Sequence, residues 1–106
     1  MGQLEIGMLI TAIEQGVVRI TEHALDEATA DGIAIPRILN APAIAEIIEQ
    51  YPKDKPLPSC LVYGECNGPL HTVWAYNETN GWAVLITVYR PDPRRWIDWR
   101  IRRSTS

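Results

Sequence analysis

The sequence predicts an α+β fold in which N-terminal helices pack on one face of a small antiparallel sheet. Apolar residues follow a helical period in the first part of the chain and a period of two after residue 58, and the two patterns occupy separate blocks. The chain has 106 residues, of which 46% are hydrophobic. This size and composition predict a single domain over residues 1–106 with one core.

The helical block contains three predicted helices and one short strand. The segment "QLEIGMLITAIEQG" has apolar residues at helical spacing and ends at Gly16, which suits a C-terminal cap. After the β-branched strand "VVRI", Thr21 is a natural N-cap for the second helix. Pro36 suits the first turn of a third helix. Because Pro42 must interrupt that helix, its continuous part is predicted over residues 42–50.

The strand block follows a proline-rich connector, "YPKDKPLP". The segments "SCLVYGEC", "LHTVWAY" and "WAVLITVY" are rich in β-branched and aromatic residues. The turn signals Asn67-Gly68 and Asn80-Gly81 separate them. These patterns predict a three-stranded antiparallel meander within residues 59–66, 70–77 and 82–89.

Charge is distributed unevenly along the chain, although its net value is only −3. Residues 1–50 hold eight acids against two arginines, giving −6, whereas residues 90–106 hold six arginines against two acids, giving +4. The basic segment is predicted to form a short helix that Trp96 and Trp99 anchor on the sheet. Its arginines have two interpretations: they pair with acids of residues 1–50, or they bind phosphate.

The cysteines indicate neither a disulfide nor a metal site. Cys60 and Cys66 are six residues apart in a predicted strand, too far apart for a bridge, and they lack the spacing of zinc ligands even with His71 nearby. We expect both thiols to be buried, and we predict no metal and no cofactor. No apolar run has the length of a membrane span and no secretory signal is visible, which predicts a cytoplasmic protein.

Several motifs resemble a known family. The chain contains His-Ala at a helix start, Gly-Ile after that helix, Tyr-Pro before the first long strand, Leu-His in the second, and Ile-Thr-Val-Tyr-x-Pro at the end of the third. This pattern, over about residues 17–96, resembles the family called domain of unknown function 4258. That family is in turn similar to the RelE and BrnT type of bacterial toxins, which are small α+β ribonucleases paired with antitoxins.

The resemblance implies a toxin-like, metal-independent ribonuclease with RNA as substrate and an antitoxin as partner. Such cleavage needs groups that move protons to and from ribose oxygens, and a cation for the charge on phosphorus. Histidine, tyrosine and arginine fit these roles. The candidates are His71, Tyr89 and His23 as catalytic residues and Arg90, Arg94 and Arg95 as phosphate-binding residues.

Each candidate also has a purely structural interpretation. His23 could bond locally at its helix start, His71 could be a half-buried surface residue, and Tyr89 could be a core ring. Where the family often has an arginine one turn after His-Ala, this chain has Asp26 or Glu27. The alternative function is therefore a non-catalytic module that keeps the fold and binds RNA backbone or an acidic protein through its basic tail.

Overall fold

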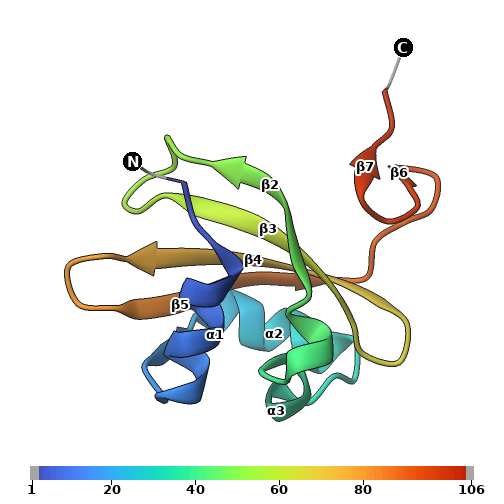
Figure 1. The fold of residues 1–106 in the computed structure, drawn as a ribbon. Coiled ribbons are helices and arrows are strands. Elements are labelled where there is room, and N and C mark those ends of the chain that lie inside the picture. Colours follow the sequence, from blue (N-terminus) through green and yellow to red (C-terminus); the bar gives the residue numbers. More distant parts are fainter. Residues whose placement is uncertain (1–2, 105–106) are drawn as a thin grey trace.

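The computed structural model describes residues 3–104 and confirms the α+β class (Figure 1). Helices lie under one face of a five-stranded sheet, and a small two-stranded hairpin stands over one end of the other face. The elements in chain order are α1 (Ile6–Glu14), β1 (Val18–Ile20), α2 (Glu22–Ala30), α3 (Ile35–Ile38), the 3-10 helix η1 (Ala41–Ala43), β2 (Glu46–Tyr51), β3 (Ser59–Glu65), β4 (Pro69–Asn77), β5 (Trp82–Tyr89), β6 (Trp96–Ile97) and β7 (Ile101–Arg102).

The predicted meander is confirmed as β3, β4 and β5, but it forms only the centre of a larger, mixed sheet. The strand order is β1-β5-β4-β3-β2. Strand β2 joins antiparallel to β3, and β1 joins parallel to β5. The sheet therefore differs from the prediction because two flanking segments, one predicted as a strand and one as a helix, add to its edges.

The first two predicted helices are confirmed together with their capping residues. Gly16 follows α1 with a φ of 73°, a conformation that a glycine adopts without steric cost. The Thr21 side chain accepts a hydrogen bond from the backbone nitrogen of Ala24 at 3.1 Å, and its hydroxyl donates to the carbonyl of Ile86 at 3.2 Å. One threonine thus caps α2 and fastens its start to β5.

The prediction of a helix over residues 42–50 is wrong. Pro36 does begin a helical turn, but α3 ends at Ile38, and Pro42 lies in η1. The next residues form β2 instead. Isoleucine fits a half-buried strand at least as well as a helix, and pairing with β3 supplies the backbone hydrogen bonds that decide between the two.

The predicted basic helix near the C-terminus is also wrong, because this segment forms the C-terminal hairpin, β6 with β7. Asp98 and Trp99 have φ values of 54° and 63°, which a right-handed helix excludes. Trp96 lies opposite Arg102, whose guanidinium carbon is 4.6 Å from the centre of the indole ring system. The tryptophan therefore anchors the segment, as predicted, but from a strand.

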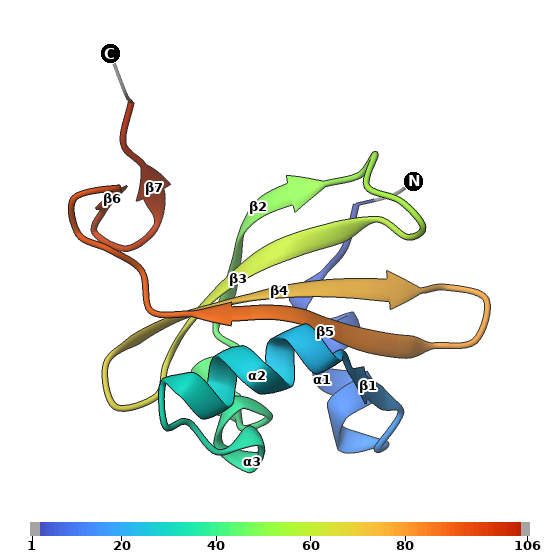
Figure 2. The same cartoon turned by 180° about the vertical axis from the view of Figure 1, so that it is seen from behind.

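The core lies between the sheet and the helices. Figure 2 shows α1 and α2 packed under the sheet. Leu9, Ala28, Trp74 and Leu85 are fully or almost fully buried there. Gly64 lets β3 approach η1 closely: a side-chain carbon at this position would lie 1.9 Å from the carbonyl oxygen of Ala43.

Within residues 3–104, no helix has the length and apolar character needed to cross a membrane.

Candidate functional site

His71 and Tyr89 lie side by side on the sheet face that points away from the helices. They are directly opposite each other on β4 and β5, and His71 Nδ1 is 2.9 Å from Tyr89 Oη. Their chain neighbours Leu70 and Val88 belong to the helix-side core, so strand alternation places this pair on the other face. The expectation that the two side chains share one face is confirmed, while their catalytic role stays a prediction.

The C-terminal hairpin closes over His71. His71 is 0% exposed, so its interpretation as a half-buried surface residue is wrong. Its Nε2 lies 2.7 Å from the Trp99 carbonyl oxygen, and the ring of Trp96 meets the imidazole edge-on at 4.5 Å. Because a carbonyl only accepts, we assign the proton to Nε2. In the neutral ring Nδ1 then accepts from the Tyr89 hydroxyl.

The pKa values of the pair move away from neutrality. Burial lowers the pKa of His71, and the hydrogen bond to Trp99 offsets only part of that effect. Burial also raises the pKa of Tyr89 to about 12. A general acid or base works best with a pKa near the operating pH. In this closed arrangement the pair is therefore a neutral, fully hydrogen-bonded unit.

Two ion pairs hold the hairpin over the sheet. Arg102 binds Glu49 through two hydrogen bonds, of 3.0 and 3.2 Å, and Arg100 Nε is 2.8 Å from Glu46 Oε1. Burial pushes the pKa of Glu49 upward, but the hydrogen bonds from Arg102 and Tyr51 outweigh it and leave that pKa lowered. The prediction that the basic segment pairs with acids of residues 1–50 is confirmed for these two arginines.

Four arginines surround an open space beside the hairpin, which we call the arginine hollow. It has a volume of about 290 Å³, and it is lined by Arg94, Arg95, Arg102, Arg103 and Ser104. Arg94 pairs with Asp92 at 3.0 Å, and Arg103 donates to the Pro93 carbonyl at 3.0 Å. Within the described chain, the Arg95 side chain has neither an ion pair nor a hydrogen bond. So many guanidinium groups around one space favour an anionic ligand.

The other two predicted residues lie elsewhere. Arg90 donates from Nη1 to the Gly68 and Pro69 carbonyls, at 3.2 and 3.0 Å, and so fastens the turn between β3 and β4. His23 stands on α2, with its side chain 67% exposed and 3.2 Å from Glu27. The structure thus brings His71 to Tyr89 and Arg94 to Arg95, but it shows no contact of His23 with His71 or Tyr89 among residues 3–104.

Glu27 has a structural contact of its own. Its Oε1 accepts a hydrogen bond from the backbone nitrogen of Val88 at 2.9 Å, which ties α2 to β5. An arginine in its place could not accept this bond. The acidic residue is therefore used for packing on the helix side.

Sequence analysis missed Glu49, Tyr51 and Tyr63 as neighbours of the site. The Tyr51 hydroxyl donates to Glu49, and Arg100 lies 4.3 Å from the ring centre of Tyr63. The prediction of a helix over residues 42–50 gives Glu49 no place on the sheet, and Tyr51 falls in the predicted proline-rich connector. The i, i+2 spacing of Glu49 and Tyr51 is the signal that would have placed both on one strand face.

No group of three or more histidine, cysteine, aspartate or glutamate side chains in residues 3–104 could hold a metal ion. Cys60 and Cys66 are free thiols, and both are buried as predicted.

The fold and site define a small α+β protein with a five-stranded mixed sheet, a closed His-Tyr pair and a basic hairpin. The family described as "Domain of unknown function (DUF4258)" matches residues 20–90, and the chain belongs to this family. Neither a curated protein nor a solved structure matches the chain. The His71–Tyr89 pair lies inside the matched residues, and the arginine hollow follows them.

Proposed function

We propose that this protein is a non-catalytic RNA-binding module that holds the phosphate backbone of single-stranded RNA in the arginine hollow. The observation that carries the proposal is the convergence of Arg94, Arg95, Arg102 and Arg103 around one open space. A planar guanidinium can hold a phosphate by two parallel hydrogen bonds. The closed state of His71 supports binding over cleavage, because neither ring nitrogen is free for a substrate.

The hairpin suits this task because its shape is fixed before a ligand arrives. Arg100 and Arg102 are held by Glu46 and Glu49, and Trp96 is only 3% exposed. Arg94 and Arg95 project from the same segment and are solvent-exposed. A preformed cluster loses less side-chain entropy on binding than a flexible basic tail would.

The test is fluorescence anisotropy with a labelled single-stranded RNA of twelve nucleotides. Arg94→Gln with Arg95→Gln should weaken binding at low salt by roughly ten-fold or more, because two charge-assisted contacts are lost. Lys53→Gln with Lys55→Gln is the matched control, since it removes the same charge from an exposed loop away from the hairpin. An equal loss of RNA affinity in both double variants would contradict the proposal. A protein that binds an acidic peptide but does not bind RNA would also contradict it.

A toxin-like ribonuclease is the second candidate, and the direct contact of His71 with Tyr89 favours it. Under this hypothesis the hairpin must leave, because the Trp99 carbonyl occupies His71 Nε2, and an antitoxin would cover the exposed face. Production without antitoxin should then slow bacterial growth, and His71→Ala or Tyr89→Phe should relieve the effect. Normal growth, with RNA intact after incubation with and without ribosomes, would exclude this candidate.

A further inference from the structure

A second hollow lies beside the turn between β3 and β4, on the helix side of the sheet. It has a volume of about 290 Å³, and we call it the Arg37 pocket. Its lining comes from α3, the α3–η1 connection, η1 and the β3–β4 turn, and consists of Arg37, Asn40, Pro42, Glu65, Cys66 and Asn67. This volume lies just below the usual range of small-molecule sites, roughly 300–1,000 Å³, and therefore suits a ligand of one ring system.

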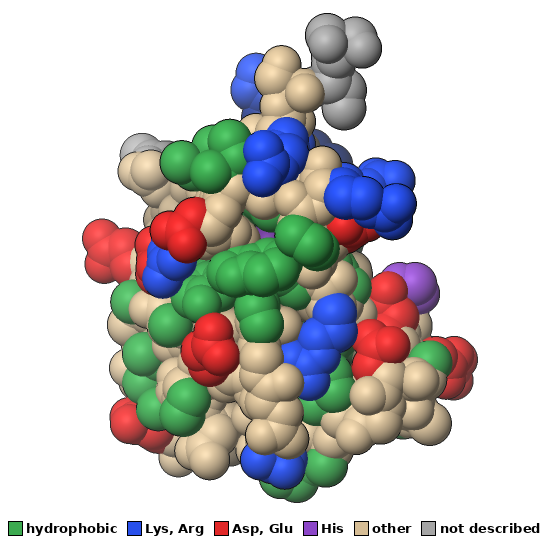
Figure 3. All heavy atoms as spheres, turned by 90° about the vertical axis from the view of Figure 1, so that its right-hand side faces the viewer, with side chains coloured by type: hydrophobic (Ala, Val, Ile, Leu, Met, Phe, Trp, Pro, Cys, Tyr) green, Lys and Arg blue, Asp and Glu red, His purple; other side chains and the backbone are tan. Residues whose placement is uncertain are grey.

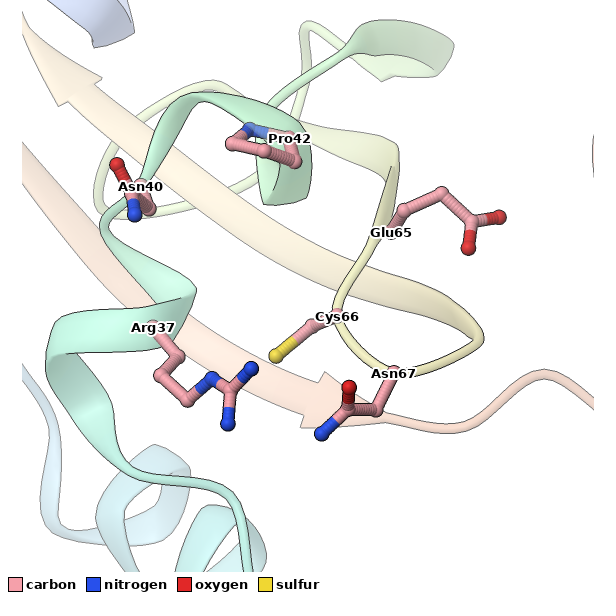
Figure 4. Close-up of a pocket in the computed structure, with 6 residues that line it drawn as sticks. All are labelled: Arg37, Asn40, Pro42, Glu65, Cys66 and Asn67. Carbon is pink, nitrogen blue, oxygen red and sulfur yellow. The ribbon is translucent and has the colours of Figure 1, made fainter.

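The side chains that face this space offer hydrogen-bond donors. Figure 4 shows the Arg37 guanidinium, the Cys66 sulfur and the Asn67 amide turned toward one another, with Glu65 directed away. The Glu65 carboxylate instead accepts from the Tyr63 hydroxyl at 2.7 Å. Over residues 3–104, the Arg37 guanidinium has no hydrogen bond or ion pair of its own. Five N–H donors are therefore available to a ligand.

A flat ligand with two adjacent acceptors matches a guanidinium best, and among the nucleobases guanine has this edge. Its O6 and N7 accept two parallel hydrogen bonds from one arginine. Adenine presents N7 next to an amino group, which would face the donors of Arg37. In single-stranded RNA, such edges are accessible because bases can be turned out of the stack.

Elements that line the Arg37 pocket and the arginine hollow lie at the same end of the molecule. The C-terminal hairpin and the β3–β4 turn both lie at the right-hand end in Figure 1, and Figure 3 shows Lys and Arg side chains at the top, centre and bottom of that end. Arg90 connects the two regions, because it fastens the β3–β4 turn and directly precedes the segment that leads to the hairpin.

We propose that the Arg37 pocket binds a guanine base of the RNA whose backbone lies in the arginine hollow. This inference rests on the proposed function and adds base selection to it. Arg37 reads the base edge, and the Asn67 amide supplies a further polar contact. Phosphate contacts alone hold RNA without regard to sequence, so preference for one base requires a site of this kind.

The test compares two twelve-nucleotide RNAs of equal charge, one of adenosines only and one with a single central guanosine. The protein should bind the guanosine RNA roughly ten-fold more tightly. Arg37→Lys keeps the charge but loses the planar fork, so it should abolish this ratio and leave binding of the adenosine RNA unchanged. Arg94→Gln with Arg95→Gln should weaken both RNAs and keep the ratio.

Equal affinity of the unaltered protein for both RNAs would overturn the inference while leaving the proposed function in place. An equal loss for both RNAs in Arg37→Lys would also overturn it. If neither RNA binds, the proposed function fails, and an NMR titration with guanosine or adenosine monophosphate decides on the pocket. If guanosine monophosphate but not adenosine monophosphate shifts the resonances of the Asn67 side-chain amide, guanine binding in the Arg37 pocket is supported. If guanosine monophosphate causes no such shift, guanine binding there is refuted.

Discussion

The two faces of the sheet are covered in different ways. On the helix side, Leu9, Trp74 and Leu85 are fully buried in one continuous apolar core. On the other side, a hairpin of two-residue strands covers His71 through a hydrogen bond and a ring contact, and ion pairs hold the hairpin in place. Burial of apolar area stabilises without direction, whereas the polar contacts depend on geometry, pH and salt. The helix side should therefore determine global stability, and the stability of the hairpin side should depend on pH and salt.

The largest expected effect comes from the helix side. Leu85→Ala should lower the free energy of unfolding by about 2–5 kcal/mol, because it leaves a cavity in a fully buried site. Trp96→Ala should cost less than half of this, because the hairpin can detach while the sheet stays folded. Urea unfolding measures both variants. A loss for Trp96→Ala as large as that for Leu85→Ala would show that the two faces are one cooperative unit.

A smaller effect should make the stability contributed by the hairpin side depend on pH, unlike that of the helix side. Burial lowers the pKa of folded His71, so as pH falls the unfolded chain takes up the proton first. Stability from this group is complete above about pH 6.5, the unfolded value, and declines below it. The urea midpoint should decrease as the pH is lowered from 7.5 to 5.5. In His71→Gln, the urea midpoint should depend less on pH.

Leu85→Ala is the control for the pH experiment, because it leaves His71 in place and should keep the slope. The pH range of the experiment, 5.5 to 7.5, also lies above the range in which Glu49 gains its proton, since the pKa of Glu49 is lowered from 4.5. An unchanged slope in His71→Gln would show that His71 is not the group responsible.

The smallest expected effect concerns the ion pair between Glu49 and Arg102. Glu49→Gln should lower the free energy of unfolding by about 1 kcal/mol or less, because the Arg102 side chain is 59% exposed. The loss should shrink in 1 M salt. Hydrogen exchange of the hairpin amides should rise at the same time, whereas the exchange of β4 should not. If the hairpin amides exchange as slowly in Glu49→Gln as in the unaltered protein, the ion pair does not hold the hairpin in place.

The central part of the fold follows from local sequence signals. The alternation of β3, β4 and β5 and the capping by Gly16 and Thr21 are properties of neighbouring residues, so they were predictable. Residues 46–51 were not, because their isoleucines fit either pattern and only pairing with β3 decides. The hairpin depends on positive φ values at Asp98 and Trp99. Aspartate adopts this conformation more often than most residues, but a bulky tryptophan rarely does, so no local signal marks Trp99 as a turn residue.

The candidate site was predictable to a similar degree. The strand assignment made β4 and β5 antiparallel neighbours, but a register shift between Val73 and Trp74 is what places His71 opposite Tyr89. No local sequence signal marks this shift, and without it the two side chains would lie on opposite faces. The closing of His71 by the Trp99 carbonyl depends on a chain segment 28 residues away, and sequence spacing carries no sign of it. The arginines of residues 90–106 were recognised as a basic segment, but the hairpin decides which of them surround the hollow.

The most direct test of the central claim is the salt dependence of RNA binding. The logarithm of the affinity for a single strand falls with the logarithm of salt concentration by about 0.7 for each neutralised phosphate. Binding in the arginine hollow predicts that Arg94→Gln with Arg95→Gln lowers this slope by about 1.4, whereas Lys53→Gln with Lys55→Gln leaves it unchanged. A slope that is the same in the unaltered protein and in the hairpin variant would contradict RNA binding in the arginine hollow.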